Sequence, residues 1–209
     1  MTDERRARLD EVVAGRLRSV TIVLENLHDP HNGAAALRSC EALGVDTIHT
    51  VGEPLRFSDK VTQGCDKWLR VLHHPSIDAC LAALHADGFQ LVAAVPGAPV
   101  ELDALPVERK TAFLLGNEHA GLSPTARAAC DVEYTIPMAG FSESFNLSVA
   151  TAISLYSFTQ RRRGFLGARG DLPAAEQLAL RALYYSLDVR GVDLIVSRYA
   201  ARAGDDAKP

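Results

Sequence analysis

Three polar segments of this 209-residue chain carry side chains of the kinds that bind and position ligands. They are ENLHDPHNGAAALR at residues 25–38, LLGNEHAGLSP at 114–124 and IPMAGFSESFNLS at 136–148. Each follows an apolar run and contains Gly and Asn, whose backbones turn sharply and expose N–H groups to a ligand. One such segment is weak evidence of a site, but three at the same edge of a sheet would build one pocket.

The third segment runs directly into an apolar helical pattern, with Asn146 at the junction. The side-chain oxygen of an Asn at this place can accept hydrogen bonds from the free N–H groups of the first helical turn. We therefore predict that Asn146 caps a helix. On this interpretation Ser144 and Ser148 are turn residues, so the residues alone leave structural and ligand-binding roles open.

The common nucleotide-binding and nucleophile motifs are absent, since the sequence contains no G-x-G-x-x-G after a strand, no G-x-x-x-x-G-K-[ST] and no G-x-S-x-G. His28 and His31 are three residues apart, but beside Asp29 and Pro30 they suit a turn better than a metal site. No C-x-x-C occurs, so we expect no metal and no disulfide framework. Four cysteines are predicted to be reduced packing residues: Cys40, Cys65, Cys80 and Cys130.

The elements that must position the polar segments follow from the hydrophobic period. Short β-branched or apolar runs predict strands at residues 19–25, 46–51, 89–95, 111–116 and 132–137. Helical patterns lie at residues 3–17, 33–44, 76–88, 123–130, 147–163, 173–187 and 192–203. This alternation predicts an α/β fold with a parallel sheet and helices on both faces. Residues 52–67 and 96–110 lack a period and are expected to be functional loops.

The length suits one domain with helical extensions. We expect an N-terminal extension at residues 1–18, a domain at 19–163 and a C-terminal extension at 164–209, whose tail from residue 204 is expected to be disordered. No apolar run is long enough for a bilayer, and no apolar stretch follows the N-terminal charges. We therefore expect a cytoplasmic protein.

Arginines gather near both ends of the chain, although its net charge is −4. The negative charge argues against general affinity for nucleic acid, because phosphates are neutralised by Lys and Arg. The clustered arginines could still form a basic surface for RNA, or only a solvated helix face. The candidate RNA-binding residues are Arg5, Arg8, Arg16, Arg161, Arg162, Arg163 and Arg169.

The polar segments also resemble the motifs of a known family. Asn32 with Arg38, GNEHAGL and IPMAGFSESFNLSVA are similar to motifs one, two and three of the SpoU family, in the SPOUT class of RNA 2′-O-ribose methyltransferases. The likeness extends over residues 19–156 and implies a deep C-terminal trefoil knot, a homodimer with its active site where two knots meet, and S-adenosylmethionine as the cofactor. The cofactor-binding residues that the resemblance implies are Leu115, Gly116, Asn117, Ile136, Met138, Ser144, Asn146 and Leu147.

The same resemblance implies catalytic roles for Asn32, Arg38, Glu118, Ser144 and Asn146. Methylation requires a ribose hydroxyl in line with the methyl donor and a way for its proton to leave. A base role has been proposed for the family's arginine, yet a guanidinium normally stays charged, so gripping a phosphate and stabilising the developing alkoxide is an alternative. From the residues alone, Arg38 could be an exposed helix charge, Asn32 a helix cap and Glu118 a solvent-facing carboxylate.

The implied substrate is tRNA. The basic N-terminal helix, KWLRV at residues 67–71 and the Arg-rich helical C-terminus resemble the branch that methylates guanosine 18 in the D-loop. Alternatives are methylation of rRNA or of the tRNA wobble nucleotide, and a non-catalytic RNA-binding module of the same fold. Members that act on large rRNA often carry a separate N-terminal domain, for which the residues before the first predicted strand leave too little room.

Overall fold

The structure, a computed structural model, describes residues 1–53, 62–117 and 119–188. The chain forms two compact units, one of residues 15–171 and one of residues 1–14 together with the chain from residue 172 on. The helix predicted at 192–203 and the tail from residue 204 lie outside the described residues. No helix in the described part has the length and apolar character needed to span a bilayer.

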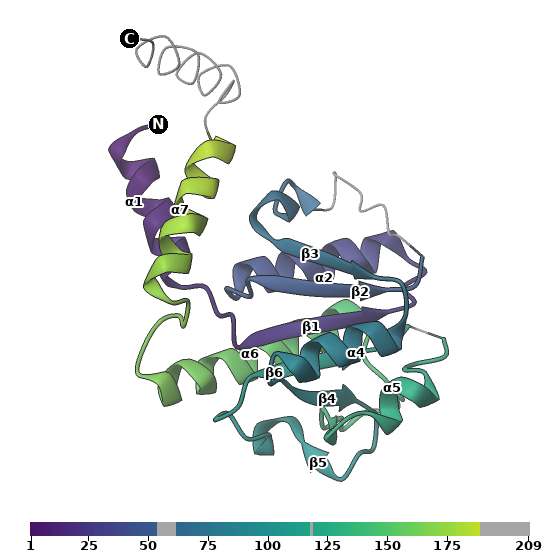
Figure 1. The fold of residues 1–209 in the computed structure, drawn as a ribbon. Coiled ribbons are helices and arrows are strands. Elements are labelled where there is room, and N and C mark those ends of the chain that lie inside the picture. Colours follow the sequence, from purple (N-terminus) through teal and green to yellow (C-terminus); the bar gives the residue numbers. More distant parts are fainter. Residues whose placement is uncertain (54–61, 118, 189–209) are drawn as a thin grey trace, which may run out of the picture. The chain divides into compact units, whose positions relative to one another are not determined.

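The larger unit is built on a seven-stranded sheet whose strands all run parallel (Figure 1). The strand order is β3-β2-β1-β6-β4-β7-β5. The predicted parallel α/β fold is confirmed, and all five predicted strands are present. The bounds are β1 (Val20–Glu25), β2 (Thr47–Val51), β3 (Arg70–His74), β4 (Gln90–Ala94), β5 (Val100–Glu101), β6 (Thr111–Leu115) and β7 (Val132–Thr135).

Two strands were not predicted, and both lie at the edges of the sheet. β3 has no fully buried residue, and β5 is only two residues long. An edge strand pairs on one side only and is partly exposed, so its side chains need not form a continuous apolar run. β5 falls within residues 96–110, where we expected a loop, whereas residues 54–61 of the other expected loop lie outside the described residues.

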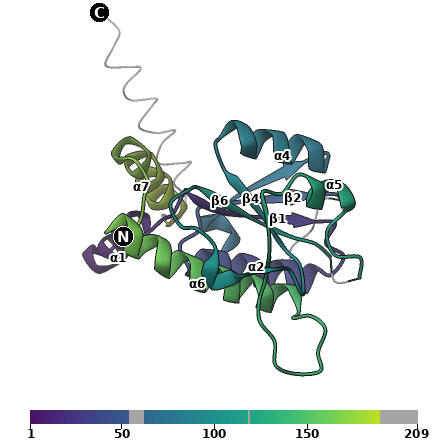
Figure 2. The ribbon, with the colours of Figure 1, turned by 90° about the horizontal axis from the view of Figure 1, so that it is seen from below.

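Helices cover both faces of the sheet, as predicted. α2 (Pro30–Ala42) and α6 (Leu147–Leu166) lie on one face, and α4 (Ile77–Ala86) and α5 (Pro124–Ala128) lie on the other (Figure 2). On the α6 face, Phe113 packs edge-on against Tyr134 and Phe158, with ring centroids 5.6 and 5.1 Å apart. The central strands β1 and β6 are buried along their whole lengths, which explains why their sequences are largely apolar.

The helices α4 and α5 each begin directly after a serine that caps them, as the sequence predicts. Ser76 Oγ accepts a hydrogen bond from Ala79 N at 3.2 Å, and Ser123 Oγ accepts one from Ala126 N at 3.1 Å. Pro124 occupies the first turn of α5, where its missing N–H leaves no hydrogen bond unmade. These local predictions are confirmed because a cap depends only on neighbouring residues.

The described part of the smaller unit contains two helices, α1 (Asp3–Ala14) and α7 (Ala174–Asp188). Leu9, Val13 and Tyr184 are buried within it. Arg5 Nη2 lies 2.7 Å from the carboxylate of Asp188, which joins the start of α1 to the end of α7. α1 ends three residues before the predicted bound of 17.

Candidate functional site

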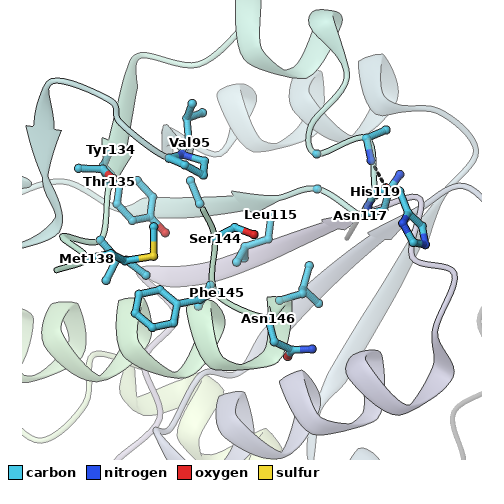
Figure 3. A pocket seen from close by; sticks show the side chains of 18 residues that line it. Val95, Leu115, Asn117, His119, Tyr134, Thr135, Met138, Ser144, Phe145 and Asn146 are labelled. Carbon is cyan, nitrogen blue, oxygen red and sulfur yellow. Dashed lines mark hydrogen bonds between the residues drawn. The ribbon is translucent and has the colours of Figure 1, made fainter. Parts of the chain in front are cut away.

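A cavity of about 460 Å³ lies beyond the carboxyl ends of β4, β6 and β7, beside the start of α6 (Figure 3). In the close view Met138 and Phe145 lie at one end and Asn117 and His119 at the other, with Ser144 between them. All eight residues for which cofactor binding was expected line this cavity. The full lining is Ala94, Val95, Pro96, Leu115, Gly116, Asn117, His119, Ala120, Gly121, Tyr134, Thr135, Ile136, Met138, Ser144, Phe145, Asn146, Leu147 and Ala150.

The exit of β6 is a tight turn closed by Asn117. Its side-chain oxygen accepts hydrogen bonds from His119 N at 2.9 Å and Ala120 N at 2.7 Å, and its carbonyl accepts one from Gly121 N at 3.0 Å. A Cβ atom on Gly116 would collide with the backbone of Gly121 and Leu122. The two chain segments approach each other so closely that only glycine fits at Gly116, and backbone groups therefore form this wall of the cavity.

The start of α6 is organised by Asn146, which is the helix cap that the sequence predicts. Its Oδ1 accepts hydrogen bonds from Ser148 N at 2.9 Å and Ser148 Oγ at 2.7 Å. Its Nδ2 donates to Asn32 Oδ1 at 3.0 Å. One side chain therefore caps α6, lines the cavity and contacts the first polar segment.

The exit of β4 also contributes to the cavity, through Ala94, Val95 and Pro96. Val95 N donates to Tyr134 O at 2.9 Å, which holds this exit against β7. Sequence patterns did not point to these residues because they carry no polar side chain. A signal was nevertheless present, since ligands bind beyond the carboxyl ends of parallel strands and residues 89–95 were predicted to be one.

The cavity is lined mainly by apolar side chains and by a few polar ones. Among its described lining residues there is no Lys, Arg, Asp or Glu. Tyr134 is fully buried, and burial raises the pKa of its hydroxyl, which shares a 2.7 Å hydrogen bond with Ser154 Oγ. Tyr134 is therefore a neutral wall residue and not an acid–base group at physiological pH.

The remaining residues for which a catalytic role was expected differ in their position relative to this cavity. Ser144 lines it, and Asn32 is half-buried in the first turns of α2 and contacts it through Asn146. Arg38 is exposed on α2, about 9 Å further along the helix axis from Asn32, and is not among the lining residues. Glu118 lies outside the described residues.

Comparison with known proteins identifies the family. The family model described as SpoU rRNA Methylase matches residues 19–156, about two thirds of the chain. The chain belongs to the SpoU methylase family.

Individual SpoU relatives align over 69–90% of the chain. The tRNA (guanosine(18)-2′-O)-methyltransferase of Escherichia coli (strain K12) is 33% identical over 186 residues, which cover 86% of this chain and 81% of the relative. The crystal structure of the A. aeolicus TrmH/SpoU tRNA modifying enzyme superposes with a TM-score of 0.80 at 29% identity, covering 90% of this chain and 98% of that one. The SpoU methyltransferase AviRb from Streptomyces viridochromogenes, crystallised with AdoMet, has a TM-score of 0.65 at 25% identity and covers 69% of this chain and 60% of that one.

The structure of this SpoU methylase corrects the expectation that Arg16 and Arg162 contact RNA. Arg16 is fully buried and donates hydrogen bonds to the carbonyls of Glu41, Val45 and Trp68 at 3.1–3.2 Å. Arg162 is 7% exposed and donates to Ser19 Oγ at 3.0 Å and to a backbone carbonyl. A guanidinium whose donors are used inside the protein cannot neutralise a phosphate, so both are structural residues.

The neighbouring arginines of α6 also bind backbone carbonyls. Arg161 donates to the carbonyls of Leu102, Asp103 and Leu105, and Arg163 donates to those of Gly15, Leu43 and Arg169. The consecutive arginines at residues 161–163 need no acidic residues beside them, because their hydrogen-bond partners are mainly backbone carbonyls. Such partners cannot be recognised in a sequence. Of the expected RNA-binding residues, those that are exposed are Arg5, Arg8 and Arg169.

Proposed function

We propose that this SpoU methylase transfers the methyl group of S-adenosylmethionine to the 2′-hydroxyl of a tRNA ribose, at guanosine 18 of the D-loop. The observation that carries the proposal is the convergence of the β6 exit, the β7 exit and the start of α6 on one cavity. Family membership supports the reaction, and the names of the E. coli and A. aeolicus relatives support tRNA as the substrate.

The residues of the cavity fit the proposed cofactor. Pockets for ligands of this size measure about 300–1,000 Å³, and the cavity of about 460 Å³ lies in that range. The apolar side chains of Leu115, Ile136 and Leu147 suit a purine, and the turn at Gly116 supplies backbone groups suited to hydrogen bonds with its polar edge. The lack of Lys or Arg among the described lining residues suits a ligand with a sulfonium charge. When bound, the cofactor supplies an electrophilic methyl group.

Arg38 is proposed to act on the RNA and not on the cofactor. A guanidinium has five N–H donors and no acceptor, so it suits the binding of a phosphate and the stabilisation of a developing alkoxide better than proton abstraction. Asn32 is a positioning residue, because it acts through its hydrogen bond to Asn146. Ser144 and Glu118 remain candidates for contact with the reacting centre.

We also propose that the chain forms the C-terminal knot of the family. We further propose a homodimer in which a second copy of the chain completes the active site. Arg38 does not line the cavity of its own protomer, and we propose that Arg38 of the partner subunit reaches the reacting atoms. An apolar surface suited to such a contact lies on α6 and the loop before it, where Phe141, Val149 and Tyr156 are exposed. The residues proposed to contact tRNA are Arg5 and Arg8 of the smaller unit and, separately, Arg169 of the larger unit. A tRNA substrate supports our proposal of a cytoplasmic enzyme.

A methyl-transfer assay with radiolabelled cofactor tests this function. We expect label to enter a tRNA transcript with guanosine at position 18, and to be lost when that nucleotide carries a 2′-hydrogen in place of its hydroxyl. Labelling of rRNA, or of position 34, would change the substrate and keep the reaction. Cofactor binding heat without transfer to any RNA would favour a non-catalytic module and overturn the proposal.

A further inference from the structure

Three metal-ligating side chains meet on the α4 face of the sheet and are not part of the cavity. They are His49 of β2, His74 at the end of β3 and Cys80 in the first turn of α4. Their ligand atoms, the ring nitrogens and the Sγ atom, all lie within 4.8 Å of one another. None of the three lines the cavity, so the cluster has no role in the function proposed above.

The strand register explains why the two histidines meet. His49 pairs with Leu72 and Val51 pairs with His74, so alternation along β3 places His74 two residues from Leu72 on the face of His49. His73 lies on the opposite face, where its Nδ1 is 3.3 Å from Thr50 Oγ1. The two histidines are 25 residues apart in the sequence, and the register of β2 and β3 brings their side chains together on one face.

α4 supplies the third ligand because it starts immediately after β3. Ser76 caps the helix, and the first turn then carries Cys80 back over the sheet, into the same core cluster as Val51 and Leu81. Cys80 is fully buried and His49 is 7% exposed, whereas His74 is half-buried. The half-buried histidine gives an ion a route from solvent to the cluster.

The donor set selects a class of ion. Two imidazole nitrogens and one thiolate suit Zn²⁺, which accepts nitrogen and sulfur ligands in tetrahedral sites, and a fourth position would be left for water. His49 Nδ1 and His74 Nε2 are 2.8 Å apart and share a hydrogen bond. Zn–N distances of about 2.0–2.1 Å would require roughly 3.3 Å between these nitrogens, so the rings need to separate by about half an ångström.

We propose that His49, His74 and Cys80 bind one Zn²⁺ ion. Each imidazole would donate a lone pair and keep its single proton on the other ring nitrogen, while the thiol would lose its proton to solvent. The bound ion would carry a net charge of +1 with its thiolate. The carboxylate of Glu25, buried on β1 and paired in register with Val51, lies on the same face of the sheet and offsets that charge. The ion would fasten the edge strand β3 and helix α4 to β2.

Titration of the chelator-treated full chain with Zn²⁺ tests the site. Calorimetry should show one equivalent bound and, in buffers of different ionisation enthalpy, one proton released. Co²⁺ should give a thiolate-to-metal absorption band. His74→Ala and Cys80→Ser should weaken Zn²⁺ binding by more than about 100-fold. The matched controls His73→Ala, on the other face of β3, and Cys130→Ser should bind as the unaltered chain does.

The half-buried position of His74 makes His74→Ala the deciding variant, since it should fold, as circular dichroism can verify. The proposal is overturned if the unaltered chain binds less than one equivalent, or if His74→Ala keeps full affinity. It is also overturned if His73→Ala loses as much affinity as His74→Ala. Methyl transfer is measured separately, so failure of the zinc site would leave the proposed enzymatic function intact.

Discussion

Asn146 Nδ2 donates a hydrogen bond to Asn32 Oδ1 at 3.0 Å, across 114 residues of sequence. The same Asn146 side chain accepts hydrogen bonds from Ser148 N and Ser148 Oγ through its oxygen. The start of α2 and the start of α6 are therefore joined by one amide group. Because Asn146 also lines the cavity, this bond links the first polar segment to the cofactor pocket.

The Asn32–Asn146 bond should couple stability to activity. Asn146→Ala removes both the cap and the bond and should lower the free energy of unfolding by about 1–3 kcal/mol, whereas Asn32→Ala removes the bond, keeps the cap and should cost about 0.5–1.5 kcal/mol. Urea unfolding of the two variants and their double variant would give the coupling energy. A coupling of zero would mean that the two side chains act independently. Ser148→Ala is the control, since it removes the bond from Ser148 Oγ to Asn146 Oδ1 and keeps both the backbone N–H cap and the Asn32–Asn146 bond.

Arg38→Ala should leave cofactor binding nearly intact and reduce methyl transfer by at least about 10²-fold, because it removes a charge-stabilising donor. Arg38→Lys should restore part of the rate through its charge, while losing the planar guanidinium geometry. Calorimetry with the cofactor and a single-turnover transfer assay separate the two effects. Arg109→Ala, another exposed arginine, is the control. Unchanged turnover in Arg38→Ala would remove the residue from the mechanism.

Gly116→Ala should abolish cofactor binding, because its Cβ would enter the backbone of Gly121 and Leu122 and force the β6 exit apart. Overpacking of this kind typically costs about 1–3 kcal/mol of stability, or more where backbone must move. Gly140→Ala is the matched control, since a Cβ there meets no atom within 4 Å. Cofactor calorimetry and thermal unfolding of both variants test the prediction, which fails if Gly116→Ala binds as Gly140→Ala does.

Arg16→Met should lower the stability of the protein strongly, whereas Arg8→Met should leave it almost unchanged. Removing the buried Arg16 guanidinium leaves three carbonyls and the Glu41 carboxylate without its hydrogen bonds and should cost about 3–5 kcal/mol of stability. Arg8 is exposed and pairs with Glu11, so its loss should change stability by less than about 0.5 kcal/mol. If Arg8 contacts tRNA, Arg8→Met should reduce the salt dependence of tRNA binding by about one unit of slope. Equal stabilities would contradict the structural role of Arg16.

Local features of this protein could be predicted from sequence because neighbouring residues determine them. Ser76, Ser123 and Asn146 cap helices through bonds to residues two or three positions away. The buried central strands could be predicted because both of their faces are covered, which makes their sequences largely apolar. The motif resemblance pointed to eight residues that do line one cavity.

Only the tertiary structure decided which distant groups meet. The Asn32–Asn146 bond and the burial of Arg16 and Arg162 each join segments that no local pattern relates. The edge strands β3 and β5 were missed for the same reason, since pairing with a neighbouring strand, and not their own apolar period, makes them strands. Buried polar groups need hydrogen-bond partners, and the fold brings these partners from distant parts of the chain. For this reason the arginines of α6 bind backbone carbonyls, which could not be read from the sequence.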